Sequence, residues 1–346
     1  MRVLHITTNY PSPGKPAFGV FVRRQVESLQ AEGVQCAVSD VDGRGSVLRY
    51  VRAWLRLFGH LLTHRYDVLH AHHALAGILL CLTTAPLWDS LLSLAGVSHP
   101  GRCILSYQNS PSHEWGKFVF RLLYPFFRRI ILKAPDADYV SYAKVRVLPN
   151  GCSADRFRPM DKAACKRELG LEPDGRYVLF VDANPRRNAR GNSQKREDRF
   201  EDVMALLQGR LGDTIRPLKL CGEAPERMPL WYNASEIYLL TSDFEGSPNA
   251  VKECLMCDVP VVATPVGDLP FLGHHCPRCH VCRGFDAQEL ADRAEAVLRG
   301  GPEDESGGDG AVAEGGAASA REALLRLGYG LEDTARKLIG IYREIL

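Results

Sequence analysis

Short apolar runs alternate with amphipathic stretches along the first half of the chain. Four of these runs have the length of buried strands, and they cover residues 3–7, 34–38, 68–71 and 103–107. Residues 20–32 instead carry apolar side chains at helical spacing, with Val22, Val26 and Leu29 on one face. A turn-rich loop at residues 10–19 separates the first strand from this helix. The alternation predicts βαβ units on a parallel sheet.

The second half of the chain repeats this alternation. Predicted strands cover residues 177–182, 217–221, 237–241 and 259–263, and predicted helices cover residues 198–211, 250–257 and 287–299. A polar, helix-prone segment at residues 155–175 links the two halves. We therefore expect an α/β protein of two Rossmann-like halves. Its ligand should lie in the cleft between them, because ligands of open α/β sheets bind beyond the carboxyl ends of the strands.

The domain boundaries follow from this pattern. Residues 1–155 are the predicted N-terminal Rossmann-like domain, and residues 156–330 are the C-terminal one. Residues 300–320 consist of Gly, Ala, Glu and Asp with almost nothing to bury, which predicts a disordered surface insertion. Residues 331–346 form an amphipathic helix that we expect to pack back toward the first domain.

Two alternatives stay open for the segment at residues 117–133, which is both apolar and basic. Either it contacts an anionic membrane peripherally, or it packs under the sheet with a basic edge. Pro125 predicts a kink within it. Beyond it, residues 139–141 and 145–148 are the last predicted strands of this half, and a Pro-Asn-Gly turn at residues 149–151 ends it.

Composition narrows the class of protein. The formal net charge of +2 over 346 residues gives no reason to expect a nucleic-acid partner. The eleven cysteines are scattered, as reduced thiols in a cytoplasmic protein are. The N-terminus lacks the apolar core of a signal peptide, and Pro86 and Asp89 interrupt the longest apolar stretch. We expect a cytoplasmic protein, and a peripheral contact with the inner face of the membrane stays open.

The most informative stretch is DFEGSPNAVKE at residues 243–253, where a predicted strand runs through a Gly-Ser-Pro-Asn loop into a helix. Backbone N–H groups at a helix start lack intrahelical partners and carry the positive end of the dipole, so they suit a phosphate. Pro248 fits the first helical turn. Glu245 and Glu253 bracket the loop with seven residues between them. One carboxylate can face a sugar while the other accepts hydrogen bonds from ribose; the plainer alternative is two ordinary surface acids.

FEGSPNAVKE, followed by CDVPVVATPVGD, resembles the retaining GT-B glycosyltransferases of the large family four. Two other stretches match that family in order. VLHITTNYPSPGKPAFGVFVRRQVESL resembles its first strand, glycine loop and helix, and VLPNGCSADRFRP resembles its crossing between domains. The resemblance spans nearly the whole chain. It implies the GT-B fold, two Rossmann-like domains facing each other across a cleft, with the first on the acceptor side and the second binding a nucleotide sugar.

The resemblance also implies roles for matching residues. Glu245 would lie against the transferred sugar, and Glu253 would hold the ribose. Gly19 would let the backbone approach the donor phosphate or the acceptor, where a side chain would block it. The loop that meets the donor diphosphate consists of Gly246, Ser247, Pro248, Asn249 and Ala250.

The family further places a basic pair on the second domain, beside the leaving diphosphate. Lys195 and Arg196 are the best candidates, and Arg186, Arg187 and Arg190 precede them in a longer loop. Cations there would stabilise the negative charge that grows as the glycosidic bond breaks. A solvated basic loop is the alternative.

The first domain departs from the family pattern in two places. Where the family often carries a histidine near the sugar, this chain has Ser106-Tyr107-Gln108-Asn109, so Gln108 and Asn109 are the candidate donors to a sugar hydroxyl. Histidines at positions 70, 72 and 73 end a predicted strand, and His72 is a candidate sugar or acceptor contact. The interval between residues 139 and 145 is short for the helix usually found there, which predicts a trimmed domain.

No metal or other cofactor is expected. Cys276, Cys279 and Cys282 lie in a stretch dense in potential zinc ligands, but a Cys-x2-Cys-x2-Cys run without a second distant pair is a poor tetrahedral site. The Asp136-Ala137-Asp138 sequence imitates the metal-binding motif of a different glycosyltransferase fold. We expect it only to open a strand.

The expected activity is that of a hexosyltransferase (EC 2.4). It would transfer a sugar, with retention, from a nucleoside-diphosphate sugar to a glycan or lipid-linked acceptor, and the resemblance suggests a role in cell-surface polysaccharide synthesis. Two other functions stay open. One is a nucleotide-sugar epimerase or a phosphorylase on the same scaffold, and the other is a non-catalytic subunit that binds sugar nucleotides.

Overall fold

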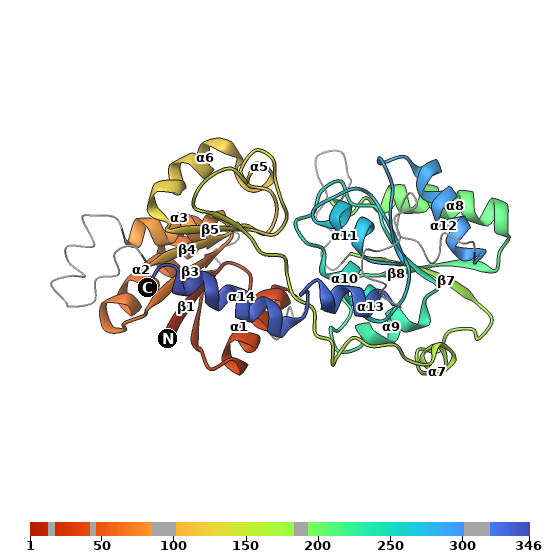
Figure 1. Cartoon of the computed structure of the whole chain (residues 1–346), viewed down its shortest axis with the longest axis horizontal. Coiled ribbons are helices and arrows are strands. Elements are labelled where there is room, and N and C mark those ends of the chain that lie inside the picture. The colour runs from red at the N-terminus through yellow and green to blue at the C-terminus, as the bar shows by residue number, and fades with distance from the viewer. Residues whose placement is uncertain (13–17, 42–45, 85–101, 183–192, 301–318) are drawn as a thin grey trace. The chain divides into compact units, whose positions relative to one another are not determined.

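The structure, a computed structural model, describes residues 1–12, 18–41, 46–84, 102–182, 193–300 and 319–346 (Figure 1). These residues form two compact units. The first comprises Met1–Gly151 together with Leu331–Leu346, and the second comprises Cys152–Gly330. Each unit is an open parallel sheet with helices on both faces, the doubly wound architecture that the alternating pattern predicts.

The first unit contains a six-stranded sheet in the order β2-β1-β3-β4-β5-β6, in which every neighbouring pair is parallel. Because β2 and β3 lie on opposite sides of β1, the strand order changes direction between β1 and β3, where open sheets of this kind bind ligands. The strands are β1 (Arg2–Thr7), β2 (Gln35–Asp40), β3 (Val68–His72), β4 (Cys103–Ser106), β5 (Arg129–Leu132) and β6 (Val145–Val147).

Two layers of helices cover this sheet (Figure 1). The helices are α1 (Val20–Ala31), α2 (Val47–Thr63), α3 (Ala74–Thr83), α5 (Pro111–Glu114), α6 (Gly116–Leu123), the 3-10 turn η1 (Tyr124–Phe126) and α14 (Leu331–Arg343). α1 and α14 pack on the face that carries Val3 and Val68. α2, α3 and α6 pack on the face that carries Leu4 and Leu69. Since successive strand residues point to opposite faces, the fully buried β3 contributes to both cores.

The second unit contains a five-stranded parallel sheet in the order β11-β10-β9-β7-β8. Counted in chain order, this is the same arrangement as the first five strands of the other unit, so its change of direction lies between β7 and β9. The strands are β7 (Arg176–Val181), β8 (Ile215–Leu220), β9 (Ile237–Leu240), β10 (Val261–Ala263) and β11 (Cys279–Val281).

Helices also cover both faces of this second sheet. α8 and α12 pack on the face that carries Val178 and Leu239, whereas α9, α10, α11 and α13 pack on the face that carries Leu179 and Tyr238. The helices are α7 (Lys162–Glu168), α8 (Glu197–Leu211), α9 (Met228–Ala234), α10 (Asn249–Met256), α11 (Leu269–His275), α12 (Ala287–Leu298) and α13 (Ala320–Arg326). Within the described ranges, none of the helices is both long and apolar enough to cross a bilayer.

Most predicted strands and helices are confirmed with small shifts at their ends, but two predictions in the first unit need correction. The strand expected at residues 139–141 is wrong. The amides of Tyr139 and Val140 donate to the carbonyl of Asp136, whose side chain accepts from the amide of Asp138. Such bonds form a turn, because an aspartate side chain can replace the backbone acceptor. The Asp-x-Asp sequence therefore opens a turn and not a strand.

The segment at residues 117–133 is also not one element. It is divided into α6, η1 and β5, with Pro125 inside η1, where its ring stops the helix. β5 then lies between β4 and β6 within the sheet. Most of the insertion expected at 300–320 lies outside the described residues.

Candidate active site

The loop between β9 and α10 is placed where a ligand is expected, because it follows the strand next to the change of direction in the second sheet. α10 begins at Asn249 with Pro248 as its N-cap, and no side chain caps it. Its first backbone N–H groups therefore keep the positive end of the helix dipole uncovered by a side-chain acceptor. The predicted donor-binding residues 246–250 all lie on this loop and first turn.

Two of the predicted catalytic residues touch each other at this loop. The ammonium of Lys195 donates to Oε1 of Glu245 over 2.7 Å, and the hydroxyl of Ser242 donates to the same oxygen over 2.8 Å. The side chain of Glu245 is 11% exposed and that of Lys195 is 23% exposed. The carboxylate is thus held in one orientation, while the ion pair keeps contact with solvent.

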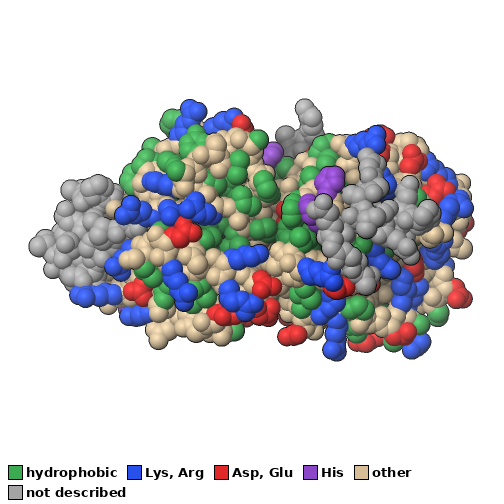
Figure 2. Space-filling view, viewed as in Figure 1, with side chains coloured by type: hydrophobic (Ala, Val, Ile, Leu, Met, Phe, Trp, Pro, Cys, Tyr) green, Lys and Arg blue, Asp and Glu red, His purple; other side chains and the backbone are tan. Residues whose placement is uncertain are grey.

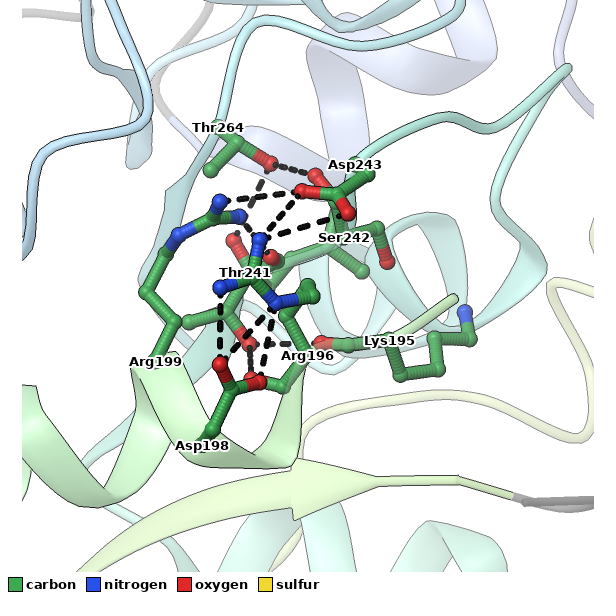
Figure 3. Close-up of polar contacts among 9 residues, drawn as sticks. Lys195, Arg196, Asp198, Arg199, Thr241, Ser242, Asp243 and Thr264 are labelled. Atoms are coloured by element: carbon green, nitrogen blue, oxygen red, sulfur yellow. Dashed lines mark hydrogen bonds and ion pairs between the residues drawn. The ribbon is translucent and has the colours of Figure 1, made fainter. Parts of the chain in front are cut away.

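The segment that carries Lys195 is joined to the β9 loop by backbone and side-chain hydrogen bonds. The amide of Asp243 donates to the carbonyl of Gln194 over 3.0 Å, and the side-chain amide of Gln194 donates to the carbonyl of Phe244 over 2.7 Å. The hydroxyl of Thr241 donates to the carbonyl of Lys195 over 2.7 Å (Figure 3). These bonds fix the start of the Lys195 side chain relative to Glu245.

Arg196, the other predicted basic residue, lies differently. Its guanidinium donates to both carboxylate oxygens of Asp198 at 2.7–3.1 Å and to Asp243 at 3.0 Å (Figure 3). Its hydrogen bonds to Asp198 raise the pKa of Arg196, with Asp243 adding to the effect. Arg199 shares Asp243, at 2.9 Å. Figure 3 shows the Lys195 ammonium directed away from this cluster. Of the two predicted basic residues, Lys195 therefore contacts Glu245, whereas Arg196 is paired with Asp198 and Asp243.

Glu253, predicted to hold ribose, is 7% exposed in the second turn of α10. Its Oε2 accepts a hydrogen bond of 2.8 Å from the hydroxyl of Tyr232, which comes from α9. Burial, together with the nearby Glu253 carboxylate, raises the pKa of Tyr232 well above its usual value, so the hydroxyl remains a donor. The sequence analysis missed Tyr232, because nothing in its local pattern pairs it with a glutamate twenty-one residues later.

A second group that the sequence analysis missed lies under the same loop. Lys252 is completely buried, and its ammonium donates to the hydroxyl of Ser247, which donates to Oδ2 of Asp268 over 2.6 Å. Asp268 is 2% exposed, and its carboxylate lies 3.8 Å from the ammonium. Both residues stand in the stretches that resemble family four, but neither carried a predicted role. Arg186, Arg187 and Arg190, the other predicted cations, lie outside the described residues.

In the first unit, Gly19 is required by the fold of its own loop. It has a φ of 70° at the start of α1, and a Cβ there would lie 2.1 Å from the carbonyl oxygen of Asn9. The sequence analysis expected room for a ligand at this glycine. The close approach that the structure shows is instead between Gly19 and the residues that follow β1.

His72, the predicted sugar contact, is fully buried, and its Nε2 lies 3.0 Å from Nδ1 of His5. Burial lowers its pKa well below the usual value, with His70, His5 and Lys133 adding to the effect. His72 therefore belongs to the core of this unit, and the prediction that it contacts a sugar is not supported by its position. The neighbouring His73 has a side chain that is 19% exposed.

Gln108 and Asn109 follow β4, and their backbone amides donate to Oε1 of Glu114 over 2.6 and 3.1 Å. The other oxygen of Glu114 accepts from the amide of Ala74 at the start of α3 over 2.9 Å. Burial alone would raise the pKa of Glu114, but hydrogen bonds from His73 and these amides lower it overall. Glu114, which the sequence analysis did not select, therefore sets the shape of the loop that carries both predicted residues.

The cysteines have the surroundings of core residues. Cys276, Cys279 and Cys282 are buried, and burial raises the pKa of each thiol. Cys254 and Cys257 form a second Cys-x2-Cys pair that was not recognised in the sequence, with eighteen residues between Cys257 and Cys276. Across the described ranges, however, these thiols form no group close enough to share a metal ion.

One set of potential metal ligands does lie close together among the described residues: His5, His70 and His72. Both ring nitrogens of His70 already have partners, the hydroxyl of Tyr342 and that of Ser106, each at 2.7 Å. We interpret these three imidazoles as a hydrogen-bonded part of the core, since an ion would have to displace those partners.

Comparisons with known proteins concern the segment that carries this site and the fold of the chain. The family model described as glycosyl transferases group 1 matches residues 191–300, which include the Lys195 segment, the β9 loop and α10. Sucrose-phosphate synthase from Thermosynechococcus elongatus has a similar fold, with a TM-score of 0.67 at 16% identity over 99% of both chains. HepE from Anabaena, solved with UDP-glucose, also has a TM-score of 0.67, at 14% identity over 99% of this chain and 100% of that one.

Residues 191–300 thus resemble the group 1 glycosyltransferases, and the chain has the GT-B fold of its solved neighbours. Among curated relatives of this chain, D-inositol 3-phosphate glycosyltransferase from Nocardia farcinica is 25% identical over 281 residues. Those residues cover 70% of this chain and 61% of that protein. A second such enzyme, from Catenulispora acidiphila, is 30% identical over 154 residues, 36% of each chain. The chain thus spans about three fifths of the length of the first relative.

Proposed function

We propose that this protein is a group 1 glycosyltransferase, an active hexosyltransferase that uses a nucleoside-diphosphate sugar and retains the anomeric configuration. The observation that carries the proposal is the contact between Glu245 and Lys195 beside the uncapped start of α10. A sugar ligand and a diphosphate need these two kinds of group side by side, a carboxylate for hydroxyls and positive charge for phosphate. Solved neighbours that contain UDP-glucose or ADP support a donor of this class.

In sugar transfer, each charged group of this site would have a separate role. Lys195 and the start of α10 would stabilise the negative charge that develops on the leaving diphosphate, so we propose no metal cofactor. Glu245 would accept hydrogen bonds from hydroxyls of the transferred sugar, and Glu253, oriented by Tyr232, would accept them from the ribose. Retention would follow from a front-face reaction. The bond from the anomeric carbon to phosphate breaks, the bond to the acceptor oxygen forms on the same face, and a phosphate oxygen receives the acceptor's proton.

The acceptor in this proposal is a glycan or a lipid-linked sugar in cell-surface polysaccharide synthesis, and the protein acts in the cytoplasm at the inner face of the membrane. Support for a membrane contact comes from α6 and its flanks. Trp115, Phe118, Leu122 and Phe126 follow one another at helical spacing and are 53%, 79%, 57% and 45% exposed. Figure 2 shows hydrophobic and basic side chains next to each other over α6. No acidic residue stands between positions 115 and 135, which suits an anionic surface.

The membrane contact is tested by sedimentation with vesicles of phosphatidylcholine containing one third phosphatidylglycerol. We expect the wild type to bind at low salt and the double variant Phe118→Ser, Leu122→Ser to lose binding. Phe271→Ser is the matched control, since Phe271 is 43% exposed but lies on the second unit. Equal sedimentation of the wild type and the double variant would remove the membrane contact from the proposal.

The transferase function is tested first by binding. Thermal shift and calorimetry with UDP, GDP, ADP, CDP and their sugars should show one diphosphate that stabilises the wild type, because a ligand of the folded state raises the melting temperature. Glu253→Ala should lose that effect. If no diphosphate binds the wild type, the donor site does not exist and the proposal fails.

Turnover of the identified donor then separates the related activities. A transferase releases the nucleoside diphosphate only with an acceptor or slowly to water, an epimerase converts the donor without any acceptor, and a phosphorylase needs inorganic phosphate. A non-catalytic subunit binds the donor but turns over none of it, and its Glu245→Gln variant behaves as the wild type. The first result supports the proposal, and each of the other three contradicts it in its own way, so the products identify the function.

A further inference from the structure

A lysine with no exposed surface lies directly beneath the proposed phosphate loop. Lys252, Ser247 and Asp268 are 0%, 5% and 2% exposed. Lys252 is in the first turn of α10, and helical side chains lean toward the N-terminus of their helix, so the ammonium reaches back to the hydroxyl of Ser247 before the helix begins. The hydroxyl in turn donates a hydrogen bond of 2.6 Å to Oδ2 of Asp268.

A backbone hydrogen bond from Asp268 also fixes the same loop. The amide of Asp268 donates to the carbonyl of Gly246 over 3.1 Å. Gly267 has a φ of 60°, and a Cβ there would lie 2.2 Å from that carbonyl oxygen. Residues 267–268 and Lys252 therefore fix Gly246 and Ser247 from two directions. A loop whose amides are fixed before the ligand binds needs little reorganisation to receive a charged group.

Stability alone is a weak explanation for this buried pair. Burial lowers the pKa of Lys252 and raises that of Asp268, which shows that the interior opposes both charges. Buried ion pairs can often be replaced by apolar side chains without loss of stability. The ammonium also lies 5.8 Å from the ring of Tyr329, a further favourable contact for a cation. The arrangement keeps the positive charge of Lys252 beneath the loop between β9 and α10, where an anion is expected.

We propose that Lys252 is a positioning residue for the donor diphosphate: its ammonium fixes Ser247 and adds positive charge beneath residues 246–249, with Asp268 as its counter-ion. This inference rests on the proposed donor site and goes beyond it, because it assigns part of the diphosphate affinity to a residue that does not reach the surface. It also predicts that removing the charge of Lys252 lowers the affinity for a diphosphate, whereas removing the charge of Asp268 does not.

The experiment compares nucleoside diphosphates with their nucleosides. Dissociation constants of UDP, GDP and ADP are measured by calorimetry, and those of uridine, guanosine and adenosine by ligand-observed NMR. For the pair that binds the wild type, Lys252→Met should weaken the diphosphate about tenfold and change the nucleoside less than about twofold. Lys252→Arg, which keeps the charge, should restore part of the diphosphate affinity.

Asp268→Asn separates charge from structure. Asparagine can still accept the Ser247 hydrogen bond, but it leaves the Lys252 charge without a counter-ion, so diphosphate affinity should stay equal or increase. A purely structural role for the pair predicts that Lys252→Met and Asp268→Asn weaken both ligands together. If Lys252→Met does not fold, the affinities of Asp268→Asn and Lys252→Arg for the diphosphate and the nucleoside still distinguish the two roles.

Lys166→Met is the matched control. Lys166 is also buried in the second unit, but its ammonium donates to the carbonyl of Gly175 and contacts Glu236, away from the loop. It should leave the ratio of diphosphate to nucleoside affinity unchanged. If the wild type binds a diphosphate and Lys252→Met binds it equally well, the role of Lys252 is refuted and the donor site stands. If the wild type binds no diphosphate, both fall.

Discussion

Acidification from pH 7.5 to pH 5.5 should destabilise the first unit much more than the second. His5, His70 and His72 are all fully buried in the first unit. Burial lowers the pKa of His5 to about 3 and those of the other two well below the usual value, with the buried Lys133 opposing charge on both. In the second unit, the fully buried His280 has its pKa lowered by burial to about 4.

The size of the effect follows from proton linkage. An unfolded histidine has a pKa of about 6.5, so below that pH the unfolded chain binds a proton that the folded chain rejects. The stabilising contribution is therefore complete above about pH 6.5 and is lost as the pH falls toward the folded pKa. At pH 5.5 each neutral buried imidazole costs about 1.4 kcal/mol relative to pH 7.5. The three in the first unit together cost about 4 kcal/mol, a large part of the 5–15 kcal/mol typical of a domain.

Hydrogen exchange read peptide by peptide can separate the two units. Between pH 7.5 and 5.5, after correction for the intrinsic pH dependence of exchange, peptides from β1 and β3 should lose about 4 kcal/mol of protection and peptides from β7 and β9 about 1.4 kcal/mol. His72→Asn should reduce the loss in the first unit by about a third, whereas His64→Asn, at an exposed position, should not. Equal losses in the two units, or none in the first, would refute the reasoning.

Three further predictions concern single side chains. Tyr232→Phe removes the hydrogen bond to Glu253, which is worth about 1.5–3 kcal/mol for a charged acceptor, and calorimetry should show donor diphosphate affinity reduced by at least tenfold. Lys195→Met should lower kcat by about a hundredfold in donor turnover while the melting temperature stays within a few degrees of the wild type. Gly19→Ala should destabilise the protein by several kcal/mol in urea unfolding, because its Cβ meets a carbonyl at 2.1 Å; Gly33→Ala, with similar φ and open space, should cost only about 1 kcal/mol.

The alternation of apolar runs predicted most strands of both sheets, because buried parallel strands are short and continuous in hydrophobic character, but it did not predict β11. It failed at residues 117–133, where apolar side chains occupy every face. Phe120 and Leu123 point into the core while Phe118 and Leu122 are exposed, so hydrophobicity alone does not mark the inner face of α6. The boundary between α6 and β5 is set by Pro125 and by pairing with neighbouring strands, which no local pattern reveals.

The parts of the candidate site that local sequence could not reveal are its tertiary contacts. Lys252 stands in a helix where residues 251–256 are all buried, and a lysine is ordinarily expected at the surface. Its partner Asp268 and the Glu253 partner Tyr232 come from other elements. The Glu-x7-Glu spacing could identify the loop, since it depends on one strand–loop–helix unit. The residues that orient this loop depend on the fold of the whole unit.

Lys195, Arg196 and Lys252 differ in how easily a bound phosphate could contact them. Lys252 has no exposed surface and donates to the hydroxyl of Ser247, so a phosphate cannot contact its ammonium directly. Arg196 makes hydrogen bonds to two carboxylates, and a phosphate would have to replace several of them at once. Lys195 donates to one carboxylate oxygen and keeps 23% of its side chain exposed, so a phosphate oxygen needs to displace a single contact. Release of Lys195 would also leave Glu245 able to accept a hydrogen bond from a sugar hydroxyl. Binding of the phosphate part of the donor would then favour binding of its sugar part, because both replace the same ion pair.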